Sequence, residues 1–390
     1  MMARNIVATI NHLRFEIVCV GICFKVIIYA KLKEFSEKYK CKIISFTLGM
    51  NINFPIFVVV KSKVEIFAEL GVRLAGFGSD DASRSVIARA LATNEWFSVS
   101  DICYAVEAVR SEMLNAEKVA QWLAHYPYAN VHEPRRVAII MAGNIPLVGF
   151  FDLMCVIANG DIPYVKPSSK DSALEEYVEQ LLRKIEPSLI IERYVEGGDY
   201  DAVIATGGES ANLYFRSAFA GIPCLLRGSR HSVAVLSGKE GKSDFALLSN
   251  DIFRHAGLGC RNVSLVFVPK GFKPKLEARR MCRAYHNNYL QCRALLTMQG
   301  AKFDDLGEAV VVSLQVAEFP RFLSQVNIVE YTSLDDVKSW LESNDESLQC
   351  VVTAIEGLHS RQVPIGEAQR PTLFDYADER DTMQFLASID

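Results

Sequence analysis

A cysteine between two glycines is the residue of this chain that is best suited to covalent chemistry. Cys260 lies in the run Ala-Gly-Leu-Gly-Cys-Arg-Asn, where Gly257 and Gly259 let the backbone turn sharply and let a substrate approach closely. Positive charge from Arg261 and His255 is expected to lower the pKa of the thiol and so to raise the fraction of thiolate, the nucleophilic form. His255 also fits a histidine stabilised by the dipole at a helix C-terminus. By itself this window favours a structural cysteine over a catalytic one, so the rest of the chain has to decide.

The composition is that of an ordinary globular protein and argues against several classes of function. The chain has 390 residues, half of them hydrophobic, which allows two or three domains with a large core. The formal net charge of −4 and the lack of a basic run argue against a nucleic-acid partner. The ten cysteines form no C-x-x-C pair, which argues against a metal centre and a disulfide framework. We therefore expect reduced thiols in a cytoplasmic protein.

The N-terminal segment differs from the rest of the chain. Residues 15–30 are apolar but contain Glu16 and Lys25, and central charges are costly in a bilayer span of about 20 residues. No small-residue cleavage site follows, so we do not expect a secretory signal. Residues 54–60 are rich in β-branched side chains and predict a strand. The segment therefore predicts two or three strands and no membrane span, with a weak membrane anchor as the alternative.

Downstream, the hydrophobic periodicity predicts helices first and then alternating strands and helices. Residues 61–123 repeat apolar side chains at helical spacing. From residue 137 onward, short apolar runs alternate with amphipathic stretches, which predicts βαβ units in a doubly wound parallel sheet. The expected strands cover residues 137–142, 162–166, 189–195, 201–205, 224–226, 232–236, 265–268, 310–313 and 350–353. The expected helices cover residues 147–158, 173–185, 209–220, 244–256, 276–296 and 334–341.

Three strand-to-helix turns carry residues suited to ligand binding. Ligands of doubly wound sheets bind at the carboxyl ends of the strands. The turns at these ends are Gly143-Asn-Ile-Pro146, Lys166-Pro-Ser-Ser169 and Thr206-Gly-Gly208. A glycine-rich turn before a helix admits a phosphate to the helix N-terminus, although a plain helix start accounts for the same residues.

The turns and the cysteine loop occur in an order that resembles the aldehyde dehydrogenase superfamily. There, a W-N-x-P turn, a K-P-S/A turn, a T-G-S turn and a G-Q-x-C loop follow one another, as Asn144, Lys166, Thr206 and Cys260 do here. Longer strings, such as Asp-Ile-Phe-Arg-His-Ala-Gly-Leu-Gly-Cys-Arg-Asn-Val-Ser, are more similar to the acyl-CoA reductases, a family that includes the fatty acid reductase of bacterial luminescence systems. The resemblance extends from about residue 60 to the end and is most specific over residues 137–268.

The resemblance implies catalytic roles for two residues. Cys260 would attack a thioester carbonyl and form an acyl-enzyme. The side-chain amide of Asn144 would form an oxyanion hole together with the backbone N–H of Cys260, and one such donor contributes about two to three orders of magnitude in rate. Without the resemblance, Asn144 is equally well explained as a turn former before a helix.

The resemblance also implies a nicotinamide cofactor, which we expect to be NADPH. Lys166 would contact the adenine ribose. Thr206, Gly207 and Gly208 would let the pyrophosphate approach a helix N-terminus. Ser168 and the serine that follows it would bind a 2′-phosphate or, alternatively, cap the next helix.

Departures from the superfamily pattern favour thioester reduction over aldehyde oxidation. Oxidative members carry a glutamate that activates water, and here Leu226 occupies its position, so hydrolysis of an acyl-enzyme should be slow. Arg227, Arg230 and His231 follow it and fit either a phosphate contact or a solvated charged loop. Leu258 replaces the usual glutamine of the G-Q-x-C loop.

Together these features predict an α/β, aldehyde-dehydrogenase-like protein with a doubly wound parallel cofactor-binding sheet and a second α/β catalytic domain. We expect an N-terminal extension over residues 1–58, a helical lead-in with the cofactor domain over 59–226, the catalytic domain over 227–362 and a return segment over 363–390. The extension has no counterpart in the family, and one hypothesis is that translation starts near Met50.

The predicted function is NADPH-dependent reduction of a long-chain fatty acyl thioester, on coenzyme A or on a carrier protein, to the aldehyde. The alternatives are a CoA-acylating aldehyde dehydrogenase that works oxidatively, a cysteine acyl-transfer protein without hydride transfer, and a noncatalytic nucleotide-binding scaffold. The resemblance also implies a homo-oligomer, formed by strand addition within residues 363–373.

Overall fold

The computed structural model describes residues 41–48, 52–59, 61–127, 129 and 132–389, and the chain divides into two units, residues 1–62 and 63–390. In the first unit, strands β1 (Cys41–Leu48) and β2 (Ile52–Val59) form an antiparallel hairpin. The predicted strand over residues 54–60 is therefore confirmed as far as Val59. Residues 15–30, and with them the alternative of a membrane anchor, lie outside the described residues. No helix within the described ranges is both long and apolar enough to cross a bilayer.

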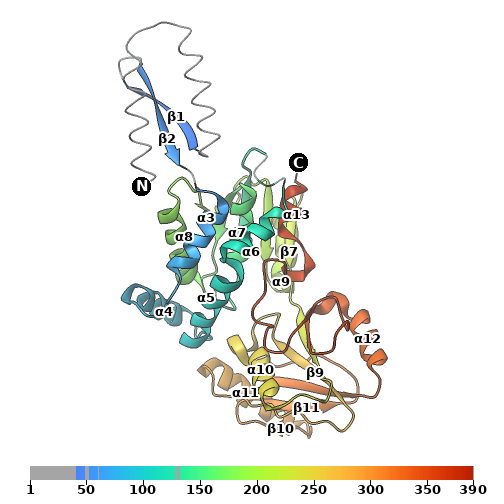
Figure 1. Cartoon of the computed structure of the whole chain (residues 1–390). Coiled ribbons are helices and arrows are strands. Elements are labelled where there is room, and N and C mark those ends of the chain that lie inside the picture. The colour runs from blue at the N-terminus through green and yellow to red at the C-terminus, as the bar shows by residue number, and fades with distance from the viewer. Residues whose placement is uncertain (1–40, 49–51, 60, 128, 130–131, 390) are drawn as a thin grey trace. The chain divides into compact units, whose positions relative to one another are not determined.

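The second unit, drawn with its labels in Figure 1, begins with four helices, which confirms the helical prediction for residues 61–123. The last three begin at capping residues, because the side chains of Asp80, Ser98 and Asn115 accept hydrogen bonds from backbone N–H groups of the first turn. Fully buried side chains such as Phe67 and Trp122 attach the helices to the core. The helices are α3 (Lys63–Arg73), α4 (Asp81–Thr93), α5 (Val99–Met113) and α6 (Ala116–Ala124).

A five-stranded parallel sheet follows, in the order β5-β4-β3-β6-β7. Successive side chains of a strand point to opposite faces. Val137 and Ile139 of β3 pack with α3–α8 on one face, whereas Ala138 packs with α9 on the other. The strands are β3 (Arg136–Ile140), β4 (Ile162–Lys166), β5 (Glu192–Arg193), β6 (Ala202–Thr206) and β7 (Cys224–Arg227). The helices are α7 (Phe150–Asn159), α8 (Ser172–Ile185) and α9 (Glu209–Ala218).

A second, seven-stranded sheet has the order β10-β11-β12-β9-β8-β13-β14, with only β10 antiparallel to its neighbour. Ala234 of β8 faces α10 and α11, whereas Val233 and Val235 face α12. The strands are β8 (His231–Val235), β9 (Val263–Pro269), β10 (Asp304–Asp305), β11 (Val310–Leu314), β12 (Gln325–Tyr331), β13 (Leu348–Thr353) and β14 (Gln362–Val363). The helices are α10 (Lys242–Phe253), α11 (Arg283–Met298) and α12 (Leu334–Ser343). Two parallel sheets with helices on both faces confirm the predicted α/β, doubly wound class.

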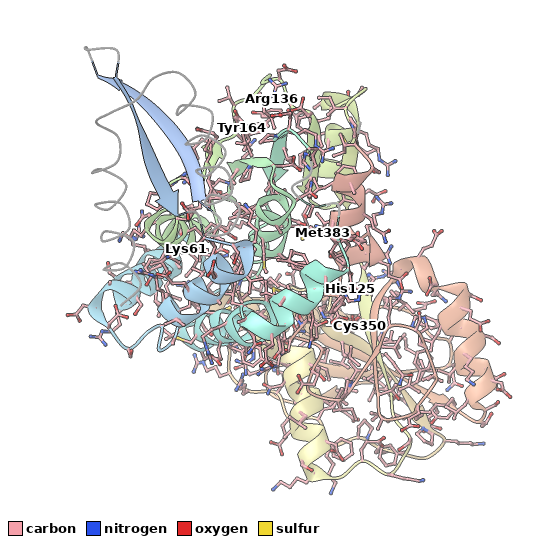
Figure 2. The ribbon with its side chains drawn as sticks, turned by 45° about the horizontal axis from the view of Figure 1, so that its top comes forward. Lys61, His125, Arg136, Tyr164, Cys350 and Met383 are labelled. Atoms are coloured by element: carbon pink, nitrogen blue, oxygen red, sulfur yellow. The ribbon has the colours of Figure 1, made fainter. Side chains whose placement is uncertain are left out.

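The C-terminal segment returns from the second sheet to the core of the first. Its last helix, α13 (Thr382–Ala387), packs beside α7, and the fully buried Met383 labelled in Figure 2 belongs to the same core as α7. The Trp122 indole N–H donates to the Tyr376 hydroxyl at 2.8 Å. The guanidinium of Arg227 forms a buried ion pair with Asp152. Together with the packing of α13 on α7, these contacts attach the C-terminal segment to helices α6 and α7.

Three predicted boundaries are wrong. The helix expected from residue 147 begins at Phe150, because Leu147 adopts a left-handed conformation with φ of 57°. The strand expected over residues 189–195 is reduced to the two residues of β5. The helix expected from residue 276 begins at Arg283, after an irregular run. Strand β12, between β11 and β9, was not predicted, although Pro320 and Ser324 before it and Ser333 after it are turn signals.

In the single chain, residues 363–373 are not extended beyond Val363, and strand addition to a second copy stays a prediction. Pro364 and Pro371 lack the N–H group that a strand donates. The backbone N–H groups of Gly366 and Ala368 donate instead to the buried carboxylate of Asp251, at 2.6 and 3.1 Å. This segment is therefore held by a side chain of its own protein.

Asp251 predicts a pH dependence of stability. Burial raises its carboxyl pKa to about 7, so the folded state holds a proton that the unfolded state releases near pH 4. The contribution of Asp251 to the free energy of unfolding is therefore complete below about pH 4 and is lost as the pH rises through about 7. We expect the free energy of unfolding to fall between pH 4 and 8, by at most about 4 kcal/mol from this group. Denaturant titrations at a series of pH values should show that the free energy of unfolding of Asp251→Asn falls less over this range. The same pH dependence in the variant and in the unmodified protein would contradict the assignment.

Candidate active site

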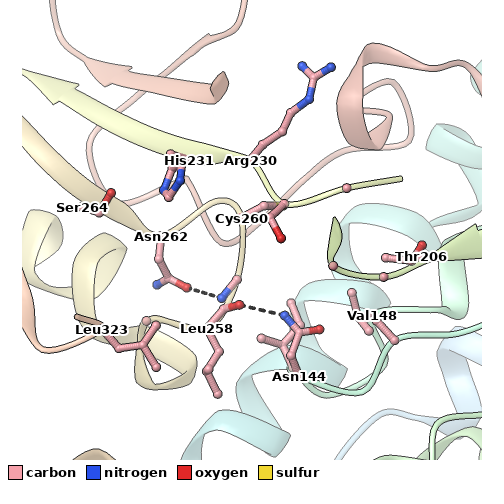
Figure 3. A pocket seen from close by; sticks show the side chains of 18 of the residues that line it. Asn144, Val148, Thr206, Arg230, His231, Leu258, Cys260, Asn262, Ser264 and Leu323 are labelled. Carbon is pink, nitrogen blue, oxygen red and sulfur yellow. Dashed lines mark hydrogen bonds between the residues drawn. The ribbon is translucent and has the colours of Figure 1, made fainter. Parts of the chain in front are cut away.

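A cavity of about 700 Å³ opens where the carboxyl ends of β3, β4 and β6 face the loop before β9. Figure 3 shows this cavity, with Asn144 and Thr206 on the side of the first sheet and Cys260 on the side of the second. Of the seven residues that the sequence singled out, six line the cavity: Asn144, Ser168, Thr206, Gly207, Gly208 and Cys260. Asn144 and Cys260, which are 116 positions apart in the sequence, thus meet in one cavity only through the tertiary fold.

Lys166 is the predicted site residue that does not line this cavity. It ends β4 with an exposed side chain, and its ammonium lies 5.3 Å from the centre of the Tyr194 ring. Lys170, four residues further along, lines the cavity instead. Sequence reasoning missed Lys170, although its spacing in Lys-Pro-Ser-Ser-Lys was a signal that could have found it.

Asn144 is held across the cavity by the loop that carries the nucleophile. Its side-chain amide nitrogen donates to the backbone carbonyl of Leu258 at 2.7 Å, shown as a dashed line in Figure 3. A side-chain amide nitrogen carries two hydrogens, so one remains for a second acceptor. The bond fixes the orientation of the Asn144 amide against a carbonyl that lies two residues before Cys260. A fixed orientation of this kind is what an oxyanion donor requires.

The loop before Cys260 contains three consecutive residues in the left-handed region, His255, Ala256 and Gly257, with φ of 55°, 54° and 69°. Such a conformation costs a non-glycine residue about 1 kcal/mol or more, so neighbours have to hold it. Asn262 does so: its amide donates to three carbonyls at the end of α10, and its oxygen accepts from the N–H of Gly259 at 2.8 Å. Sequence reasoning missed this role of Asn262, since nothing local distinguishes it.

His255 does not behave as the charged end of a helix. Its side chain is buried, and burial lowers the imidazole pKa to about 4, so the ring is neutral at pH 7. The interpretation as a cation stabilised by the helix dipole is therefore wrong. The physical reason is that desolvation of a charged ring outweighs the attraction of the helix terminus.

Cys260 is a half-buried thiol whose pKa is raised, not lowered. Burial raises the thiol pKa to about 11, and the opposite effect of Arg261 is smaller. The guanidinium of Arg261 donates to the carbonyl of Ala368, which occupies part of its hydrogen-bonding capacity. The Ser232 hydroxyl donates to the Cys260 carbonyl at 2.9 Å and anchors the loop to β8. The expectation of a lowered pKa is wrong for the free protein, because desolvation exceeds the charge effect.

The two glycines after β6 differ in what surrounds them. A Cβ atom on Gly207 would lie 2.7 Å from the Cβ of Ala211, so the close packing of α9 requires glycine there. A Cβ atom on Gly208 would meet nothing within 4 Å, and this residue lines the cavity in front of α9. The backbone there is open to a bulky group, and the helix N-terminus favours a negatively charged one.

Ser168 is positioned by the neighbouring turn and does not cap the next helix. A Cβ atom on Gly143 would lie 2.4 Å from the Ser168 hydroxyl oxygen, so the two turns touch. Helix α8 begins after Asp171, three residues later, so the capping interpretation of Ser168 and Ser169 is wrong. The hydroxyl oxygen of Ser168 accepts from the Lys170 N–H at 3.3 Å and forms a turn before the helix.

The basic residues after β7 do not form a solvated charged loop. Arg227 is buried, paired with Asp152 and donating to the Thr382 hydroxyl at 2.7 Å. Arg230 lies 3.4 Å from a carboxylate oxygen of Asp378 and donates to a backbone carbonyl. The His231 ring stacks on Phe319, at 4.1 Å between ring centres. The solvated-loop interpretation is wrong for this set, because residues distant in the chain, among them Asp152, Phe319 and Asp378, supply partners that no local pattern predicts.

A second, smaller cavity of about 160 Å³ meets the first at Cys260. The two cavities share four lining residues, Ile145, Val148, Gly259 and Cys260. The remaining wall of the second is mostly apolar and includes Ala105, Ala108, Val109 and Met113 of α5 and Phe151 of α7. The thiol therefore lies between a larger cavity, which the glycine-rich turns and Lys170 line, and a smaller cavity whose wall combines apolar side chains with a few charged ones. The apolar part of the smaller cavity is suited to a hydrocarbon chain.

The arrangement suits attack on a carbonyl by a thiolate, with the developing oxyanion held by an oriented amide. Within the described ranges, no three or more His, Cys, Asp or Glu side chains gather in a way that could hold a metal ion.

Comparison with solved structures identifies the fold. No protein-family model and no curated protein matches the chain. The chain is similar to aldehyde dehydrogenase 21 from Physcomitrella patens in complex with the reaction product succinate, with a TM-score of 0.60, 11% identity and coverage of 83% of this chain and 82% of that one. It therefore has the aldehyde-dehydrogenase-like fold, with two α/β domains, as the resemblance implied.

Two further solved structures share this fold. An acetylating aldehyde dehydrogenase from Geobacillus thermoglucosidasius aligns with a TM-score of 0.53 and 12% identity, over 80% of this chain and 84% of that one. An aldehyde dehydrogenase from Mycobacterium tuberculosis complexed with NAD+ aligns with a TM-score of 0.53 and 14% identity, over 75% and 72%.

The raised pKa of Cys260 predicts its reactivity in the free protein. We expect the rate of alkylation by iodoacetamide to rise about tenfold per pH unit between pH 7 and 10, because only the thiolate reacts. Mass spectrometry of the peptide that contains Cys260 measures this rate separately from the other thiols. A plateau below pH 9 would show that the thiol is ionised more easily than its burial implies.

Proposed function

We propose that this protein is an NADPH-dependent acyl-thioester reductase that converts a fatty acyl-CoA, or the same acyl group on a carrier protein, to the aldehyde. The observation that carries the proposal is the position of Cys260, where a larger cavity lined by the strand-to-helix turns meets a smaller cavity lined by apolar residues of α5 and α7. A thioester has the same two parts, a reacting polar head and a hydrocarbon chain. The fold alone supports no particular reaction, so the proposal rests on the site.

The first step is acyl transfer to the cysteine. The Cys260 sulfur forms a bond to the thioester carbonyl carbon, the carbon–sulfur bond to coenzyme A breaks, and the coenzyme A thiolate takes up the proton that Cys260 gives up. The amide of Asn144, oriented by the Leu258 carbonyl, donates to the oxyanion that develops. When bound, NADPH supplies the hydride that reduces the acyl carbon.

The last step releases the aldehyde. The oxyanion of the reduced adduct re-forms the carbonyl, the bond between the carbon and the Cys260 sulfur breaks, and the thiolate regains a proton from solvent. The sequence resemblance aligns Leu226, on β7, with the water-activating glutamate of oxidative enzymes. Without that base, an acyl-enzyme lives long enough to be reduced or to return to coenzyme A.

The residues present fit a dinucleotide. Gly208 leaves open backbone in front of α9, where a pyrophosphate is favoured by the helix N-terminus. Ser168 and Lys170 line the cavity beside it and are suited to a 2′-phosphate, the group that distinguishes NADPH from NADH. We assign the adenine ribose to Lys166, at the end of β4, whose side chain would have to turn from Tyr194 toward the cavity.

The acyl chain belongs in the apolar cavity beside α5. The resemblance implies a long chain, whereas about 160 Å³ is close to the roughly 150 Å³ of a cavity that binds benzene, which has six carbons. A longer chain would need room beyond this cavity. Substrates of two lengths therefore have to be compared directly.

The alternative within this class is an acylating aldehyde dehydrogenase that uses the same residues to form acyl-CoA. The solved acetylating enzyme with the same fold favours keeping this alternative. The direction depends on concentrations of aldehyde, coenzyme A and cofactor. Oligomer formation and a cytoplasmic location remain predictions from the sequence.

Activity is tested with NADPH and either hexanoyl-CoA or myristoyl-CoA, beside Cys260→Ala. We expect NADPH oxidation with equimolar aldehyde and coenzyme A, lost at least about a thousandfold in the variant because the covalent path is removed. Acyl group trapped on Cys260 without NADPH oxidation would indicate acyl transfer alone. Full activity in Cys260→Ala would sink the mechanism.

Gly208 and Gly207 form a matched pair for testing the cofactor site. Gly208→Ala should leave the melting temperature unchanged, because a Cβ atom there would meet no protein atom within 4 Å. It should raise the NADPH dissociation constant at least about tenfold, because the methyl group would occupy space that the pyrophosphate needs. Gly207→Ala should lower the melting temperature, because its methyl group would collide with Ala211. Fluorescence titration and thermal unfolding measure both. Unchanged NADPH binding in Gly208→Ala would exclude this turn as the pyrophosphate site.

A further inference from the structure

We propose that Asp171 is a positioning residue that holds the 143–149 loop, and with it the Asn144 amide, in the geometry needed to stabilise the oxyanion, and that Asn94 assists it. The inference rests on the proposed function, because it concerns the efficiency of the same acyl-transfer step. Neither residue lines the cavity that contains Asn144, and both act on the backbone around it.

The loop contains a strained residue. Leu147 is buried and has φ of 57°, a left-handed conformation that costs a non-glycine residue about 1–2 kcal/mol. Its backbone N–H donates to a carboxylate oxygen of Asp171 at 2.7 Å, in a buried setting. A hydrogen bond between neutral groups contributes about 0.5–1.5 kcal/mol, which is comparable with the cost of this strain.

The use that Asp171 makes of its carboxylate is unusual for its position. Asp171 is the N-cap of α8, where an aspartate normally accepts from N–H groups of its own helix. Its side chain makes no such bond and reaches the loop instead. The α8 helix thus gives up a local cap so that a carboxylate can hold Leu147.

The placement of Asp171 also carries an electrostatic cost. Its second carboxylate oxygen has no hydrogen-bond partner, and Glu175, one turn along α8, is buried with both oxygens unpartnered. Burial raises the pKa of both carboxyls. Two buried carboxyls one turn apart are costly to desolvate, so the contact with Leu147 has to offset part of this cost.

A second contact holds the other end of the loop. The buried Asn94, at the C-terminus of α4, donates its side-chain amide to the carbonyl of Gly143 at 3.1 Å. Asn144 therefore lies between a backbone carbonyl fixed by Asn94 and a backbone N–H fixed by Asp171. Its own amide then meets the Leu258 carbonyl at 2.7 Å. Because a displacement of about 1 Å can cost about a hundredfold in rate, this double attachment sets the efficiency of the donor.

The test compares Asp171→Ser, Asp171→Asn and a control, Asp161→Ser. Serine keeps a good N-cap, so α8 can form, but its hydroxyl is one bond shorter than the carboxylate and falls short of Leu147. Asparagine keeps the length and one acceptor oxygen. Asp161 is equally buried and accepts from Arg135 before β4 begins, at the end of the sheet far from the site.

Two rates separate positioning from general damage. The rate of coenzyme A release in a single turnover with hexanoyl-CoA reports acyl transfer, which forms an oxyanion. The rate of Cys260 alkylation by iodoacetamide reports the reactivity of the thiol alone, because this reaction forms no oxyanion. We expect Asp171→Ser to slow acyl transfer about 10- to 100-fold with alkylation within about twofold, Asp171→Asn to recover most of the rate, and Asp161→Ser to alter neither rate.

A double variant decides whether Asp171 acts through Asn144. If it does, Asn144→Ala with Asp171→Ser will be no slower in acyl transfer than Asn144→Ala alone. Multiplied losses, or equal slowing of alkylation in Asp171→Ser, would overturn the positioning role while leaving the proposed function intact. An unimpaired Asn144→Ala would refute the oxyanion role of Asn144 and this inference with it. No acyl transfer by the unmodified protein would instead refute the proposed function.

Discussion

The site depends on one hydrogen bond between the two halves of the larger unit, from the Asn144 amide to the Leu258 carbonyl. Asn144 follows a strand of the first sheet, and Leu258 precedes a strand of the second. The contact therefore joins the turn after β3 of the first sheet to the loop before β9 of the second sheet. Around it the backbone is held in conformations that are rare for side-chain-bearing residues, at Leu147 on one side and at His255 and Ala256 on the other. Strain of this kind persists only where the surroundings over-determine it.

The same surroundings keep the Cys260 thiol protonated, and therefore weakly reactive, in the free protein. Cys260 lies in a setting whose desolvation disfavours the thiolate, and the charge of Arg261 does not compensate. A thiol in this state resists adventitious alkylation and oxidation, because both need the thiolate. A bound substrate or cofactor changes the local charge and solvation and so can shift this balance. The C-terminal return segment contributes as well, since it accepts hydrogen bonds from Arg261 and Arg227 and forms an ion pair with Arg230.

Much of the fold was predictable because its signals are local. Buried parallel strands such as β3 and β6 are continuous apolar runs, and β4 was predicted at its observed limits. The glycine turns before α9 and the Gly160 C-cap of α7 are likewise properties of a few adjacent residues. The errors occurred where a distant group decides the local conformation. Helix α7 starts late because Asp171 holds Leu147. In the single chain, Asp251 likewise accepts from N–H groups within residues 363–373.

The sequence by itself determined the α/β class, the order of the elements and the identity of the residues able to do chemistry, because strand, helix and turn preferences act over a few neighbours. Only the tertiary structure decided that Cys260 is desolvated, that Arg227 is buried in an ion pair, that Lys170 lines the cavity and that Lys166 does not. Those properties depend on which groups face one another across the two sheets. Burial and hydrogen-bond partners are set by atoms distant in the chain, and no local pattern of residues encodes them.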